Sequence, residues 1–169
     1  LHAATMVTAG IYLIIRTNKI SIILDESILT NIKSFIIIIG TLTILFAGFS
    51  AFGQYDIKKI IAFSTCAQIG FMFISLYAYL PSYGSLFHLL THGFFKALLF
   101  LSAGLIIHNF FNEQDLRKSG LFSSLSPFFF LLFLIGSLAL LPLPPLSGFF
   151  SKEIILFHSL LNNNLSLFF

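Results

Sequence analysis

The sequence predicts an all-α protein, a polytopic transmembrane helical bundle with one discontinuous, Pro-broken helix. Two observations underlie this prediction. Only 9% of the residues are charged while 57% are hydrophobic, and the mean hydropathy is +1.00. The few charges also stand at helix-length intervals between apolar stretches. A soluble chain of this size could not hide so much apolar surface, so the composition excludes a soluble enzyme, a disordered tail and a nucleic-acid-binding protein.

The charge-free stretches define the elements of a single membrane domain over residues 1–169, because crossing about 30 Å of hydrocarbon takes about 20 apolar residues. We expect, in order, a partial transmembrane helix at 1–16, transmembrane helices at 34–55, 60–80 and 85–108, and a discontinuous helix over 121–161 broken at 142–148. The first segment offers too few apolar residues for a full crossing before Arg16, and it opens with Leu1 rather than Met. We therefore expect the chain to be completed by another polypeptide or to be a fragment.

The break in the last stretch follows from Pro142, Pro144 and Pro145. Each proline removes a helix hydrogen bond and collides with the preceding turn. In lipid, irregular backbone is tolerated only inside protein or beside a wet cavity. Lys152 and Glu153 follow this break in the second half-helix, where unwound backbone and helix ends can tune an ionisable group. The alternative for Lys152 is that it snorkels from a helix end to the interface.

His88, His92 and Lys96 lie four residues apart, so they form one stripe along a helix. A lysine at mid-membrane costs about 2.5–3.5 kcal/mol, so it normally faces a cavity or a partner. Groups that each take and release a proton form a relay. The alternative is a structural stripe that joins helices by hydrogen bonds. A structural zinc site requires four ligands, and a membrane haem requires histidines on two facing helices. The sequence therefore disfavours both a zinc site and a haem site at these histidines.

The sequence lacks the residue patterns that redox, nucleotide-binding and hydrolytic sites require. Cys66 is the only cysteine, and phosphate loops, dinucleotide fingerprints, iron–sulfur patterns and Ser-His-Asp groupings are absent from the sequence. We therefore expect no redox or metal site and no cofactor on this chain. By composition alone, His2 is interpreted as a packing residue among small neighbours.

Five blocks of sequence, in this order along the chain, resemble the chain 5 family of antiporter-like membrane subunits of NADH:ubiquinone oxidoreductase, respiratory complex I. They are residues 1–13, 56–65, 87–99, 114–118 and 147–153. The resemblance implies a fold of two inverted five-helix repeats, each with a half-channel, of which this chain would hold the second repeat and the end of the first. It also implies a proton-translocating role, in which His2, His88, His92, Lys96 and Lys152 match the family's central hydrophilic axis and Glu153 matches an adjacent acidic position.

The same resemblance implies the partners and the location. The FMN, the iron–sulfur clusters and ubiquinone would belong to other subunits of the complex, and a separate chain would supply the missing first repeat. The chain would be a multi-pass protein of the mitochondrial inner membrane, or of the bacterial plasma membrane, in contact with lipid and not with nucleic acid. Two alternatives remain: a subunit of a multi-subunit cation/proton antiporter, and a structural membrane scaffold with no transport role.

Overall fold

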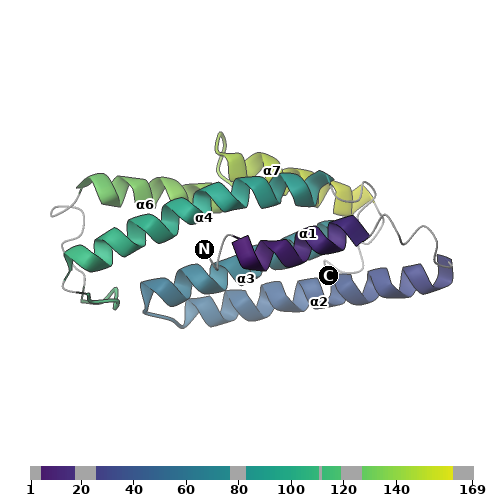
Figure 1. Ribbon diagram of the computed structural model, residues 1–169, viewed down its shortest axis with the longest axis horizontal. Helices are drawn as coiled ribbons and strands as arrows, with labels where there is room; N and C mark the ends of the chain where they lie inside the picture. The colour runs from purple at the N-terminus through teal and green to yellow at the C-terminus, as the bar shows by residue number, and fades with distance from the viewer. Residues whose placement is uncertain (1–4, 18–25, 77–82, 111, 119–126, 162–169) are drawn as a thin grey trace.

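The computed structural model describes residues 5–17, 26–76, 83–110, 112–118 and 127–161 (Figure 1). These residues form helices and turns, and one isolated β-bridge joins Asp56 to Asp115. The helices of the described ranges are α1 (Val7–Thr17), α2 (Glu26–Phe52), α3 (Ile57–Leu76), α4 (Tyr83–Asn109), α6 (Pro127–Leu140) and α7 (Ser147–Leu161).

Helices α3 and α4 form the centre of the bundle. Helix α2 and the short α1 pack against α3, whereas α6 and α7 follow one another along α4, and α7 also contacts α3 (Figure 1). The side chains of α3, α4 and α7 therefore meet in the interior. This meeting of three helices is where the buried polar residues gather.

Within the described part of the chain, three helices are long and apolar enough to cross a membrane: Thr30–Phe52 within α2, Ile57–Leu76 and Tyr83–Asn109. Helix α2 begins at Glu26, well before the expected span at 34–55. The charge-free stretch marks the part of a helix suited to hydrocarbon, and backbone hydrogen bonds can continue into a polar connector beyond it. The fold class is the predicted one, an α-helical membrane bundle.

The proline-rich break separates α6 from α7. Helix α6 ends at Leu140 and α7 begins at Ser147, and short-range backbone bonds such as Leu146 N–H to Leu143 O fill the interval. Gly148 permits this geometry, because a Cβ atom there would collide with the carbonyl oxygen of Ala139. The two half-helices thus approach closely enough for backbone to touch backbone.

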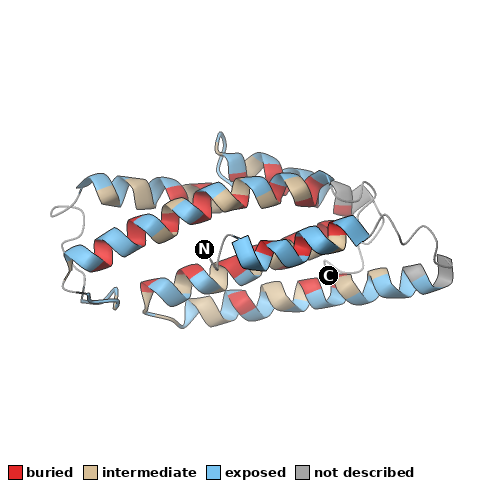
Figure 2. Cartoon of the chain, in the orientation of Figure 1, coloured by how far each residue is buried: buried red, intermediate tan, exposed pale blue. Residues whose placement is uncertain are grey.

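Burial follows one face of α4 along its length (Figure 2). The buried positions recur every three or four residues, as a helix with one inward face requires. Two apolar clusters lie beside the buried polar residues. One joins α3 and α4 through Ile57, Ile61, Leu99, Ala103 and Ile107, and the other joins α1 to α3 through Ile11, Ile15, Met72 and Leu76.

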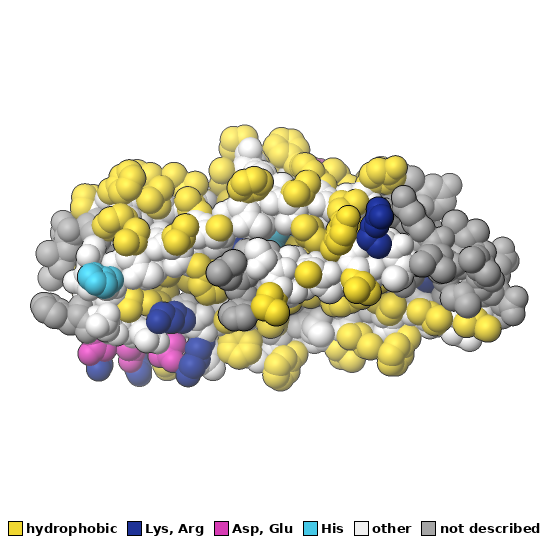
Figure 3. Space-filling view, viewed as in Figure 1, with side chains coloured by type: hydrophobic (Ala, Val, Ile, Leu, Met, Phe, Trp, Pro, Cys, Tyr) yellow, Lys and Arg dark blue, Asp and Glu magenta, His cyan; other side chains and the backbone are white. Residues whose placement is uncertain are grey.

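The turn between α2 and α3 pairs with the loop that follows α4, and residues 55–59 and 112–118 are called the paired turns below. Ile57 N–H donates to Gln114 O at 3.1 Å, and Leu116 N–H donates to Tyr55 O at 3.1 Å. Acidic and basic side chains gather at this end of the molecule, while hydrophobic side chains cover the flanks (Figure 3). This distribution is typical of a water-exposed end on a membrane bundle.

Candidate functional site

Lys96 on α4 is completely buried. Its ammonium group donates to Ile61 O at 3.1 Å and to Ser64 Oγ at 2.5 Å, both on α3. Among the described residues no carboxylate lies within ion-pair distance of it; the ion pairs found there are all at the paired turns. Lys96 is thus a buried cation whose partners in the described ranges are neutral oxygens.

His88, two turns earlier on α4, is bound at both ring nitrogens. Nε2 lies 3.0 Å from Gln68 Oε1 on α3, and Nδ1 lies 2.9 Å from Ser151 Oγ on α7. The ring itself is fully buried. His88 therefore connects three helices at the point where they meet.

His92 lies between His88 and Lys96 and differs from both. It is fully buried, and neither ring nitrogen has a hydrogen-bond partner among the described residues. Its contacts are aromatic: its ring centroid lies 6.1 Å from that of His88 and 5.3 Å from that of Phe95, edge to face. An unpaired buried polar group costs about 1–3 kcal/mol, so its presence calls for an explanation other than stability.

Lys152 on α7 reaches back across the break. Its Nζ donates to Leu140 O, the last residue of α6, at 2.6 Å, and lies 5.7 Å from the centre of the Phe71 ring. The carboxyl end of a helix attracts a cation. Lys152 is only 8% exposed and close enough to interact electrostatically with His88, His92 and Lys96. In this structure the Lys152 side chain is therefore not extended to the surface, as snorkelling to the interface would require, and the wet cavity beside it stays a prediction.

The structure brings together four of the six predicted site residues: His88, His92, Lys96 and Lys152. Glu153 is exposed, on a different side of α7 from Lys152. His2 lies outside the described residues. Its role in the axis and the separate chain that would supply the first repeat both stay predictions.

Sequence reasoning missed the neutral partners Ser64, Gln68 and Ser151. Ser64 and Gln68 are four residues apart on α3, so they share one face of a mainly apolar helix, and that spacing was a usable signal. Ser151 is fully buried directly before Lys152, but nothing in the sequence indicates which residue it contacts.

The chemistry available here is proton exchange. Lysine and histidine can each carry a proton in one state and lack it in the other, and the surrounding hydroxyl groups can donate to or accept from either state. The described residues contain no group of three His, Cys, Asp or Glu side chains able to hold a metal ion.

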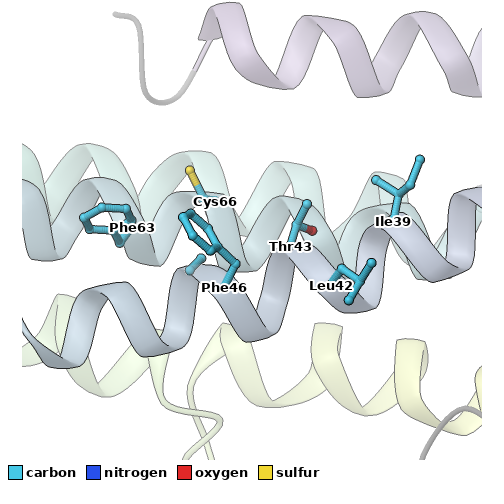
Figure 4. Close-up of a pocket in the computed structure, with 7 residues that line it drawn as sticks. Ile39, Leu42, Thr43, Phe46, Phe63 and Cys66 are labelled. Carbon is cyan, nitrogen blue, oxygen red and sulfur yellow. The ribbon is translucent and has the colours of Figure 1, made fainter.

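A separate hollow of about 380 Å³ lies between α2 and α3 (Figure 4). It is lined by Ile39, Leu42, Thr43, Phe46, Ala47, Phe63 and Cys66. None of the lysines or histidines of the interior takes part in it. We therefore assign the candidate site to His88, His92 and Lys96 on α4 and Lys152 on α7, called the buried row below, rather than to this hollow.

Comparison with known proteins identifies the family of the chain. The family model described as NADH:quinone oxidoreductase/Mrp antiporter, TM, matches residues 1–169. NADH-ubiquinone oxidoreductase chain 5 of Acanthamoeba castellanii is 50% identical over 157 residues, which are 92% of this chain and 22% of that protein. NADH-quinone oxidoreductase subunit L of Rickettsia typhi is 52% identical over 157 residues, 92% of this chain and 23% of that protein.

The chain thus spans less than a quarter of the length of these two relatives, and the matched part contains the whole buried row. Identity near 50% over 92% of the chain, together with a family match along its full length, leaves no ambiguity about descent. The chain belongs to the NADH:quinone oxidoreductase/Mrp antiporter transmembrane family.

Proposed function

We propose that this chain forms a proton-translocating half-channel in the membrane arm of a respiratory NADH:ubiquinone oxidoreductase. The proton path consists of His88, His92 and Lys96 along α4 together with Lys152 on α7, which interacts electrostatically with all three. His2 and Glu153 are proposed to extend the path, as the family resemblance implies. The redox reaction takes place on other subunits, which hold the FMN, the iron–sulfur clusters and the quinone.

The observation that carries the proposal is the bonding of Lys96. A lysine buried for structural reasons alone is normally paired with a carboxylate, because an isolated charge is costly to bury. Lys96 instead binds a carbonyl and a hydroxyl oxygen. No carboxylate in the described ranges holds it in the charged form, so the charge can leave together with the proton.

The location and the partners follow from the same proposal. The chain lies in the mitochondrial inner membrane, or in the plasma membrane if the source is bacterial. It assembles with other subunits of the membrane arm and with the part of the antiporter-like fold that lies outside these 169 residues, whether or not a separate chain supplies that part.

The family name also covers Mrp antiporter subunits, so cation/proton exchange is the second candidate function. The two relatives named above carry oxidoreductase names, which favours the first. Membrane vesicles that contain the purified complex distinguish the two functions. An oxidoreductase acidifies one side of the membrane, and does so only when NADH and quinone are supplied. An antiporter exchanges protons for another cation, driven by a cation gradient and without NADH.

The test replaces Lys96 by Ala in the assembled complex, with Lys96→Met as a second variant that keeps the side-chain length. Because the row loses its terminal proton carrier, we expect proton pumping to fall about tenfold or more while assembly on a native gel persists. The matched control is Lys58→Ala, which removes an exposed lysine at the paired turns. An assembled Lys96→Ala complex with an unchanged proton-to-electron ratio and unchanged turnover would falsify the relay and favour the scaffold.

A further inference from the structure

The ring of His88 has a hydrogen-bond partner at each of its two nitrogens. Gln68 approaches Nε2 from α3 and Ser151 approaches Nδ1 from α7, at 3.0 and 2.9 Å. Gln68 is 4% exposed and Ser151 is completely buried. His92, one turn away, has no such partners among the described residues. Generic helix packing does not explain why one histidine is fixed from both sides and its neighbour is not.

The bond to Gln68 determines which ring nitrogen carries the permanent hydrogen. An amide oxygen accepts hydrogen bonds and has no proton to give, so the ring must donate Nε2–H to Gln68 Oε1. In the neutral ring the other nitrogen, Nδ1, then bears the lone pair. That lone pair faces Ser151 on the second half of the broken helix.

The Ser151 hydroxyl matches both protonation states of the ring. When Nδ1 is bare, the hydroxyl donates to it. When Nδ1 carries a proton, Nδ1–H donates to Ser151 Oγ, and the hydroxyl hydrogen can turn to Ser147 O at 3.1 Å or Gly148 O at 3.3 Å. Only the hydroxyl rotor moves, so neither state leaves the hydroxyl without an acceptor.

We propose that Gln68 and Ser151 are positioning residues that make Nδ1, the nitrogen facing α7, the atom at which His88 takes up and releases its proton. This inference rests on the proposed function. In the step, Nδ1 gains the hydrogen of the Ser151 hydroxyl. The hydroxyl takes a proton in turn from a cationic donor, for which we propose the Lys152 ammonium on the same helix, so the ring becomes a cation and the lysine a neutral amine. Nε2 keeps its hydrogen throughout, bonded to Gln68, and the total charge of the site does not change.

The electrostatic surroundings of His88 are simple enough for a pH test. Among the described residues, the titratable groups that face it are His92 on its own helix and Lys152 on α7, whereas α3 contributes the neutral Gln68. A change of charge at position 68 therefore acts on the ring from a side where no titratable group of the described ranges interacts with it.

The experiment uses the complete complex in vesicles and measures NADH-driven proton uptake as a function of pH. In Gln68→Glu, a carboxylate accepts from Nε2–H and stabilises the protonated ring, so we expect the pH profile to move upward by about one unit or more. In Ser151→Ala, Nδ1 loses its partner, so we expect pumping to fall about fivefold. Ser151→Thr restores the hydroxyl and should restore most of the rate.

The matched control is Ser102→Ala. Ser102 is a buried serine on α4 whose hydroxyl donates to the Leu98 and Leu99 carbonyls of its own helix. A merely structural role for Gln68 or Ser151 would lower the yield of complex but leave the pH profile of the assembled fraction in place. An unmoved profile in Gln68→Glu, or an equal loss in Ser102→Ala and Ser151→Ala, overturns the positioning role.

Failure of this inference can be told apart from failure of the proposed function. If Lys96→Ala is impaired while Ser151→Ala and Gln68→Glu keep the wild-type rate and profile, only the positioning role is wrong. If Lys96→Ala also pumps normally, the relay itself is wrong. If the Ser151→Ala complex fails to assemble, the pH profile of Gln68→Glu alone decides whether the positioning role is correct.

Discussion

Arg117 at the paired turns lies 2.7 Å from the Asp115 carboxylate, whereas Lys96 inside the bundle binds a carbonyl and a hydroxyl oxygen. The contrast extends beyond these two side chains. Lys59 and Lys118 at the paired turns also have carboxylate partners, at 2.9 and 3.5 Å. Lys152, in the interior, binds the carbonyl oxygen of Leu140.

Depth in the bundle, and not residue type, therefore decides which partner a cationic side chain binds here. At the water-exposed end, a lysine or arginine can find both water and a carboxylate, and its charge is permanent. In the interior, a permanent ion pair would hold the proton in place. Neutral oxygens accept the ammonium hydrogens without that constraint, which suits a group that must pass its proton on.

Lys152→Met tests the interior half of this comparison most severely. Methionine keeps the chain length but has no proton to transfer and cannot donate to Leu140 O. We therefore expect coupled turnover of the assembled complex to fall about tenfold or more. The control Lys118→Met removes a lysine of the paired turns and should leave the rate unchanged. Equal rates for the two variants would contradict the distinction between the two regions.

His92→Phe separates function from stability within the row. Phenylalanine fills the ring volume beside Phe95 and removes two nitrogens that have no partner in the described ranges. We expect the assembled complex to withstand heating as well as the wild type does, or better, while pumping falls several-fold. A less stable complex that pumps normally would show that His92 serves packing instead.

Gly148→Ala tests whether the break itself is needed. The added Cβ would collide with the Ala139 carbonyl oxygen, so the half-helices must move apart at a cost of about 1–3 kcal/mol. We expect a lower melting temperature and less assembled complex. Gly104→Ala is the matched control, because nothing lies within 4 Å of its Cβ position. If the two variants are equally stable, the close approach at the break is not required.

Much of the fold could be predicted because the membrane restricts where charges and prolines can lie. Lys96 and the two histidines share one helix face by their spacing, and a mid-membrane lysine must face inward. Pro142, Pro144 and Pro145 predicted the break, which lies between Leu140 and Ser147. These predictions depend on the chain's own periodicity and need no knowledge of how the helices meet.

The neutral half of the site could not be predicted in the same way. Ser64, Gln68 and Ser151 are ordinary polar residues on two other helices, and only the packing of α3 and α7 against α4 brings them to the row. The turns of α2 from Glu26 to the expected span at 34–55 could not be read from hydropathy, because hydropathy reports the apolar part of a helix and not its hydrogen bonding. The pairing of residues 55–57 with 114–116 joins segments far apart in the sequence, which local patterns do not report.

Asp115→Asn tests the exposed half of the comparison, and we expect the smallest effect. The side-chain and backbone hydrogen bonds from Arg117 lower the pKa of Asp115 from its usual 3.8 to about 2. A carboxylate with a lowered pKa stabilises the folded loop at every pH above its ordinary value, and this contribution is lost as the pH falls from about 4 towards 2. The pair is exposed and screened by salt, so the loop should open only slightly more often in the variant.

Hydrogen exchange of the Ile57 and Leu116 amides, which bond across the paired turns, measures this opening in the intact complex. The difference between wild type and Asp115→Asn should be small, constant from pH 8 to 5 at low salt, and reduced at high salt, with pumping unchanged. A large loss of pumping in this variant would mean that the paired turns take part in the proton path, and the division between a permanent, exposed set of charges and a mobile, buried set would no longer hold.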